Sequence, residues 1–122
     1  MNFSTACYVN IIIHGRKGLE DLRMLVDAGF TYTVLDPKTI EELGLLETPY
    51  IVELVFAGKR KVKAKLFLAE VEVAGRRGPV FVAEVDTPTP LLGVYALETL
   101  GFKVDPKTGR LEEISPEGGY LL

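Results

Sequence analysis

Apolar residues in this chain recur at every second position in short runs, and glycine or proline turns separate the runs. Tyr50, Val52, Leu54 and Phe56 fall on one face of an extended segment, which is the pattern of a half-buried β-strand. The 122 residues include 12 glycines and 7 prolines, so many turns are expected. Few segments show a long helical period. The sequence therefore predicts one all-β domain with one or two short helices.

Turn residues divide the chain into its expected elements. A short helix is expected over residues 37–43, with Asp36 as N-cap and Gly44 at its end. A second helix is expected over residues 94–100, before Gly101. The expected strands cover residues 8–13, 22–26, 31–35, 50–56, 62–73, 79–85, 102–104 and 110–114.

The strand over residues 62–73 changes its apolar face along its length. Val62 and Leu68 share one parity, whereas Ala69 and Val73 share the other. Since side chains alternate with a period of two, this change predicts a β-bulge or bend near Leu68 and Ala69.

A weak internal repeat relates two parts of the chain. At an offset of 57 residues, VLDPKTIEELGL over residues 34–45 aligns with LLGVYALETLGF over residues 91–102. Each part is predicted to form a strand, a loop and a short helix that ends at glycine, which indicates two halves around a pseudo-twofold axis. Only the first half carries an Asp-x-Gly turn, because Glu84 stands opposite Asp27 and no glycine follows Glu84 two residues later.

Charge and cysteine content argue against several classes of protein. The net charge of −3 and the pI of about 5.2 disfavour a nucleic-acid binder. Basic residues gather at positions 59, 60, 61, 63 and 65, and the lysines from position 61 onward are interpreted as the solvated face of a strand. The single Cys7 excludes an intrachain disulfide and a cysteine-based zinc cluster. No apolar run reaches the roughly 18 residues of a membrane span, and no signal-peptide pattern begins the chain. We expect a cytoplasmic chain with no cofactor, metal, membrane or nucleic-acid partner.

One acidic residue ends an apolar strand. Asp27 follows Met24-Leu25-Val26, and Gly29 comes two residues later. A lone carboxylate is a poor catalyst of peptide hydrolysis, whereas two carboxylates about 3 Å apart share one proton and can act as base and acid. A lone Asp that precedes a small residue and a glycine is usually a turn residue. Glu84 and Asp86 are expected to be solvated, close to a loop at Pro88 and Pro90, and not to supply a second catalytic acid.

The segment LVDAGFTYTVL over residues 25–35 resembles the active-site stretch of retropepsin-like aspartic proteases, usually hydrophobic-hydrophobic-Asp-Thr/Ser-Gly-Ala. PLLGVYALE over residues 90–98 resembles the second signature of that family, a hydrophobic pair followed by glycine and a helix. The hairpin over residues 56–64 lies between them, where the family has its flap. The order matches along about residues 8–111, and the chain is most similar to small standalone prokaryotic members.

The resemblance implies a single-lobe acid-protease closed barrel over residues 1–114, a C-terminal tail over residues 115–122, and a homodimer with its active site on the twofold axis. Each subunit would supply one catalytic Asp27 to an aspartic endopeptidase that cleaves extended peptides or unfolded proteins. The other implied site residues are the active-site loop (Ala28, Gly29), the substrate-binding flap (Phe56, Ala57, Gly58, Lys59, Arg60) and the supporting second signature (Leu91, Leu92, Gly93).

Ala28 departs from the family pattern, which has Thr or Ser at this position. In the family that hydroxyl braces the two active-site loops across the dimer axis. Losing a hydrogen bond costs about 0.5–1.5 kcal/mol, and a symmetric dimer loses it twice, so we expect a weaker dimer and reduced or absent activity. Two alternatives therefore stay open: a non-catalytic homodimer that binds peptides or acts as a scaffold, and a monomeric structural β domain.

Overall fold

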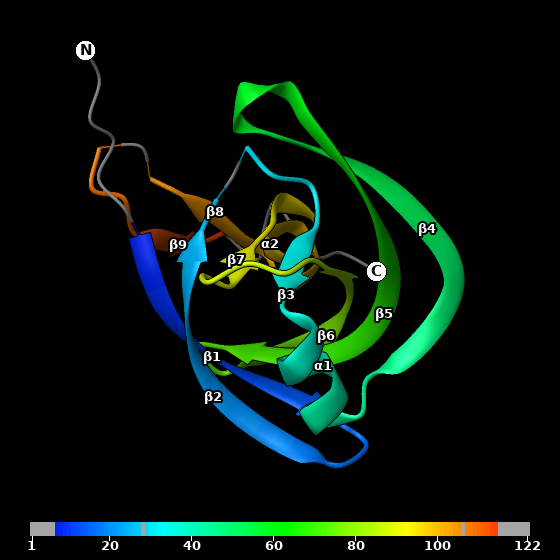
Figure 1. The fold of residues 1–122 in the computed structure, drawn as a ribbon. Helices are drawn as coiled ribbons and strands as arrows, with labels where there is room; N and C mark the ends of the chain where they lie inside the picture. Colours follow the sequence, from blue (N-terminus) through cyan, green and yellow to red (C-terminus); the bar gives the residue numbers. More distant parts are fainter. Residues whose placement is uncertain (1–6, 28, 106, 115–122) are drawn as a thin grey trace.

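The computed structural model describes residues 7–27, 29–105 and 107–114 (Figure 1). These residues are mostly β with two short α-helices, as predicted. The predicted C-terminal tail over residues 115–122 lies outside the described residues. The strands are Cys7–Gly15 (β1), Gly18–Val26 (β2), Thr33–Leu35 (β3), Leu46–Phe56 (β4), Arg60–Val73 (β5), Arg76–Glu84 (β6), Leu91–Leu92 (β7), Phe102–Val104 (β8) and Leu111–Glu113 (β9). The helices are Pro37–Leu43 (α1) and Val94–Leu100 (α2), with a 3₁₀ turn over Ala57–Lys59 (η1).

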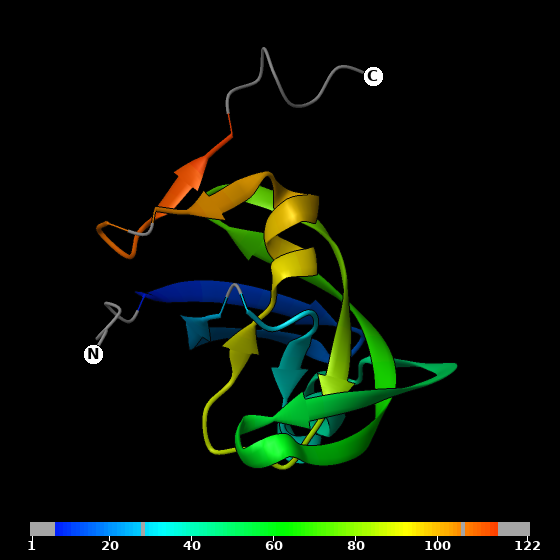
Figure 2. The same cartoon turned by 90° about the horizontal axis from the view of Figure 1, so that it is seen from above.

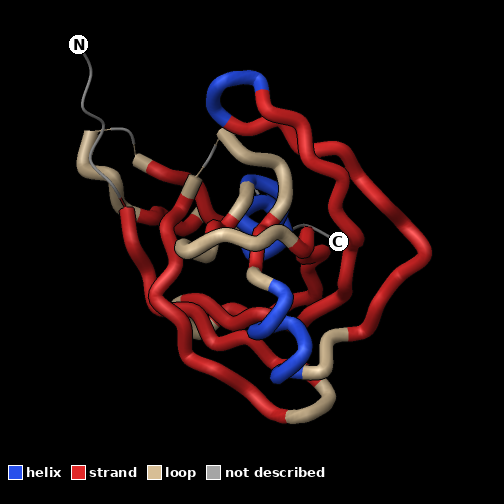
Figure 3. Tube along the Cα trace, viewed as in Figure 1, coloured by secondary structure: helices blue, strands red, loops and turns tan. Residues whose placement is uncertain are grey.

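The main sheet closes on itself. Its strands pair in the order β1-β2-β7-β3-β6-β5-β4, and β1 also pairs with β5, for example at Ile13 and Val71. The strands thus form a ring that is visible along the chain trace (Figure 3). Within this sheet β4 lies at the edge beside β5, while β8 and β9 form a separate hairpin. No helix in the described part of the chain is long and apolar enough to cross a membrane.

Two hydrophobic clusters lie on opposite faces of the same strands. The larger cluster includes Phe67 and is covered by both helices, whereas the smaller one includes Leu66 and lies under the β4–β5 hairpin. This arrangement explains the change of apolar face along β5, because neighbouring residues are buried in different clusters. Of the two predicted possibilities near Leu68 and Ala69, the bulge is wrong, because β5 pairs with β6 without interruption from residue 66 to residue 73. β5 instead bends along its length (Figure 1). The register shift lies in β4, between Glu47 and Ile51.

Local signals fixed both helices as predicted. The Asp36 carboxylate accepts hydrogen bonds from the Thr39 backbone N–H (3.3 Å) and hydroxyl (2.6 Å), which caps the first turn of α1. Gly44 and Gly101 end α1 and α2 in the left-handed conformation, at φ of 67° and 81°. Glycine adopts this conformation without the steric cost that a side chain adds.

The internal repeat is visible in the strand pairing. Val34 of β3 pairs with Leu91 of β7. These two residues occupy equivalent positions in the two parts of the repeat. On either side, β2 runs parallel to β7 and β3 runs parallel to β6. The two halves are therefore related by a pseudo-twofold axis near the Val34–Leu91 pair.

Candidate active site

Asp27 lies at the end of β2, where β2 meets β7. Its backbone N–H donates to the Leu92 carbonyl at 3.0 Å, and its own carbonyl accepts from the Phe30 N–H at 3.1 Å. The carboxylate accepts from the Gly29 N–H at 3.0 Å. Asp27 is half-buried and Gly29 is exposed. These bonds fix the carboxylate on a tight turn beside the core, while Ala28, the other residue of the predicted loop, lies outside the described residues.

The second signature holds this loop through its backbone. Leu92 is fully buried, and the Gly93 N–H donates to the Thr33 hydroxyl at 3.2 Å. Thr33 is the one buried polar residue among those described, with 1% of its surface exposed. A Cβ at Gly93 would lie 2.8 Å from the Thr31 carbonyl oxygen and closer still to the Tyr32 carbonyl group. Residue 93 must therefore be glycine for the two segments to approach this closely.

The first turn of α2 donates to the same loop. The Val94 N–H donates to the Phe30 carbonyl at 2.7 Å and the Tyr95 N–H donates to the Thr31 carbonyl at 3.1 Å. These bonds satisfy N–H groups that have no partner within a helix. The Tyr95 ring also meets the Tyr32 ring edge-on, with the centroids 5.6 Å apart. The loop after Asp27 is thus attached to α2 on one side.

The β4–β5 hairpin faces the other side of this loop (Figure 2). The Phe56 ring lies 5.2 Å from the Phe30 ring, and the Arg60 guanidinium lies 5.1 Å from the Phe56 ring centre. At the hairpin tip, Gly58 and Lys59 have φ of 78° and 62°, and Ala57 is exposed like them. The structure therefore brings Phe56 of the predicted flap against Phe30, the residue that follows the predicted active-site loop.

The next feature of the site is the set of charged groups and possible metal ligands around Asp27. Among the described residues, Asp27 takes part in no ion pair. In that part of the chain no three His, Cys, Asp or Glu side chains gather where they could hold a metal ion.

Burial raises the pKa of the Cys7 thiol above its ordinary value, and Cys7 begins β1 in the core.

Two sequence predictions about charged residues have different outcomes. The lysines of β5 lie on its exposed face, as predicted, opposite Ile51, Glu53 and Val55 of β4. Glu84 is the last residue of β6, within the expected strand over residues 79–85, and pairs with Leu35. It is half-buried, so it is less solvated than predicted. Asp86 is exposed, as predicted.

Sequence reasoning missed three residues that shape this region. Phe30 and Tyr32 make the aromatic contacts on either side of the loop, and Thr33 bonds to the second signature. The sequence contained one indication of this, since Thr33 places a hydroxyl next to the apolar Val34 in a short strand. A buried polar group requires a hydrogen-bond partner. The identity of that partner depends on a pairing between segments 60 residues apart.

Comparison with known proteins assigns the family. A family model described as aspartyl protease matches residues 9–96, which include the Asp27 loop, the β4–β5 hairpin and β7. A search of curated proteins found no match to the chain. The family match covers most of the 122 residues. The chain therefore belongs to the retropepsin-like aspartyl protease family.

Proposed function

We propose that the chain is one subunit of a homodimeric aspartic endopeptidase, with Asp27 of each subunit in a dyad on the twofold axis. The observation that carries the proposal is the placement of Asp27: a half-buried carboxylate without an ion-pair partner among the described residues, fixed by backbone bonds at the end of a core strand. The chain has one Asp-x-Gly turn, so it can supply only half of a dyad. Symmetric pairing is the commonest way to complete such a site.

In the proposed mechanism the two carboxylates share one proton, since they cannot both ionise at about 3 Å. The ionised member takes a proton from a water, and the protonated member donates a hydrogen bond to the scissile carbonyl. The water oxygen attacks the carbonyl carbon and gives a tetrahedral intermediate. The C–N bond then breaks as the leaving nitrogen accepts a proton from the dyad.

The substrate would be an extended peptide or an unfolded protein. It would lie between the Asp27 loop and the flap, residues 56–60, and pair with the hairpin as an added strand. Gly29 is exposed and has no side chain, so a substrate backbone can approach it. The second signature (Leu91, Leu92, Gly93) would support this loop through two hydrogen bonds. The Leu92 carbonyl accepts from the Asp27 N–H, and the Gly93 N–H donates to the Thr33 hydroxyl.

We also propose a specific fold class and a cellular location for the enzyme. The ring of strands would be a single-lobe acid-protease barrel within a domain of residues 1–114, and the enzyme would act in the cytoplasm. Ala28 would weaken the dimer, because it lacks the hydroxyl that would brace the two loops, at about 0.5–1.5 kcal/mol for each lost bond. For the same reason a second candidate function is a homodimer that binds peptides without cutting them.

The test is cleavage of an unfolded protein across about pH 3 to 7, where a shared proton can be held, at high protein concentration so that mass action favours the dimer. We expect the parent to cut and the Asp27→Asn variant, which keeps the shape of the side chain, to be inactive. Ala28→Thr should increase both cleavage and the dimer fraction in sedimentation.

Three outcomes contradict parts of the proposal. Cleavage by Asp27→Asn at the parent rate would remove Asp27 from the mechanism. A parent and an Ala28→Thr variant that both dimerise but do not cut would favour the peptide-binding function. A monomer at every concentration would contradict both.

A further inference from the structure

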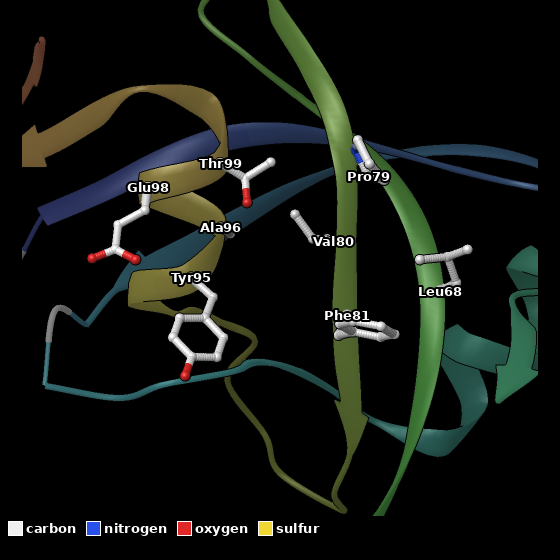
Figure 4. A pocket seen from close by; sticks show the side chains of 8 residues that line it. All are labelled: Leu68, Pro79, Val80, Phe81, Tyr95, Ala96, Glu98 and Thr99. Carbon is white, nitrogen blue, oxygen red and sulfur yellow. The ribbon is translucent and has the colours of Figure 1, made fainter. Parts of the chain in front are cut away.

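A groove of about 400 Å³ lies between α2 and the strands β5 and β6 (Figure 4). Its volume is within the range of about 300–1,000 Å³ that is usual for ligand sites. The proposed mechanism does not use it. Its apolar lining comes from Leu68, Pro79, Val80 and Phe81 on the strands and from Tyr95 and Ala96 on α2.

The groove continues into a strip of exposed apolar side chains. Leu46 pairs with Leu68, which pairs in turn with Phe81, so these residues form a row across β4, β5 and β6. Their exposed fractions are 49%, 37% and 43%, and that of Tyr95 is 53%. Single exposed apolar residues are common, but a contiguous row beside a groove indicates a binding surface.

One end of the groove lies beside the segment that follows Asp27. Tyr95 lines the groove, its N–H donates to the Thr31 carbonyl in the segment after Asp27, and its ring contacts the Tyr32 ring. A chain that leaves the site past Tyr32 would therefore meet Tyr95 first.

The charge of the groove indicates what it binds. Glu98 contributes a carboxylate to the lining and is exposed, and it has no ion pair among the described residues. The lining contains no Lys or Arg. If two copies met with the groove on their twofold axis, the groove would face its own equivalent and Glu98 would gain no cation. A segment that carries an apolar side chain and a basic one matches the groove better.

We propose that this groove is an exosite for a distal segment of the polypeptide substrate, with a large apolar side chain between Phe81 and Tyr95 and a Lys or Arg near Glu98. The inference rests on the proposed function for its substrate. It adds a second recognition site outside the cleft, which would favour long unfolded chains over short peptides.

The test begins with oxidised insulin B chain, in which the parent's cleavage sites are mapped by mass spectrometry. A short peptide that spans one site is then extended, at each end in turn, with an arm containing Leu-Phe-Lys or a control arm containing Ser-Gly-Ser. We expect the Leu-Phe-Lys arm at one end to lower KM about tenfold, the effect of burying one large apolar side chain, with kcat unchanged.

Two groove variants and a matched control make the result specific. Phe81→Ser should abolish the advantage of the apolar arm without changing cleavage of the short peptide. Glu98→Lys should change the preference from Leu-Phe-Lys to Leu-Phe-Glu, which a loss of stability would not do. Leu19→Ser, at a residue of β2 that is 59% exposed and outside the groove, should behave like the parent.

A binding assay distinguishes failure of the inference from failure of the proposed function. A fluorescein-labelled peptide with the Leu-Phe-Lys arm should bind the parent and Asp27→Asn alike, and Phe81→Ser should weaken its binding about tenfold in fluorescence anisotropy. Binding that depends on Phe81 but without cleavage would retain the groove and reject the enzyme. The inference would be overturned if the labelled peptide bound Phe81→Ser as tightly as the parent. It would also be overturned if Phe81→Ser converted the dimer to a monomer while the Leu-Phe-Lys arm still lowered KM.

Discussion

Replacing Gly93 with alanine should destabilise the chain strongly, although its backbone is extended, with φ −90° and ψ 174°, and suits any residue. The added Cβ would lie 2.8 Å from the Thr31 carbonyl oxygen and closer to the Tyr32 carbonyl, whereas unstrained contacts need about 3.5–4.0 Å. Both neighbours are backbone groups and cannot rotate away. The loop after Asp27 must therefore move by roughly 1 Å.

The size of the effect follows from the contacts that this movement disturbs. Overpacking costs about 1–3 kcal/mol. Separation of the Gly93 N–H from the buried Thr33 hydroxyl, 3.2 Å away in the parent, adds about 1–3 kcal/mol because both groups lose a partner. A loss of about 4 kcal/mol is a large part of a typical stability of 5–15 kcal/mol. It corresponds to a melting temperature lower by about 15 °C for a domain of this size.

The assay is thermal and urea unfolding followed by circular dichroism, with Gly75→Ala as the matched control. Gly75 has φ of 82° and no atom within 4 Å of an added Cβ, so alanine there should cost only the left-handed backbone strain of about 1–2 kcal/mol. If Gly93→Ala proves no less stable than Gly75→Ala, the close approach of the two segments is not what requires glycine, and the reasoning is refuted.

Three further predictions test other parts of the structure. Thr33→Val keeps the side-chain volume but leaves the Gly93 N–H without its acceptor, so the free energy of unfolding should fall by about 1–3 kcal/mol in urea titrations; no change would mean that another group replaces the hydroxyl. Asp36→Ala removes the cap on Thr39 and should cost about 1 kcal/mol, whereas Asp36→Ser should recover most of it. Because burial raises the pKa of the Cys7 thiol, iodoacetamide near pH 8 should modify the folded chain far more slowly than the unfolded chain; equal rates would contradict its burial.

The family assignment sets the general chemistry, and the structure indicates where this chain differs from the family pattern. Phe30 stands at the position where the pattern usually has alanine, and its ring contacts Phe56 of the hairpin. A large ring at this point narrows the space between the loop and the β4–β5 hairpin. Together with Ala28, this leads us to expect that substitutions in the segment after Asp27 change activity and specificity.

The sequence alone determined the features that depend on neighbouring residues. Asp36, Gly44 and Gly101 set the limits of α1 and α2, because caps and left-handed glycines act within one turn of a helix. The hairpin tip at Gly58 and the position of Asp27 after an apolar strand could be predicted for the same reason. The internal repeat also predicted the pseudo-twofold relation between the two halves.

The tertiary structure alone decided which distant segments meet. β2 begins at Gly18, four residues before the predicted start, because pairing with β1 holds its polar residues in the sheet. The partner of Thr33, the register shift in β4 and the two clusters that divide Leu66 from Phe67 all depend on contacts between segments far apart in the chain. Local patterns carry little information about such contacts, since burial and hydrogen bonding depend on the residue that arrives opposite.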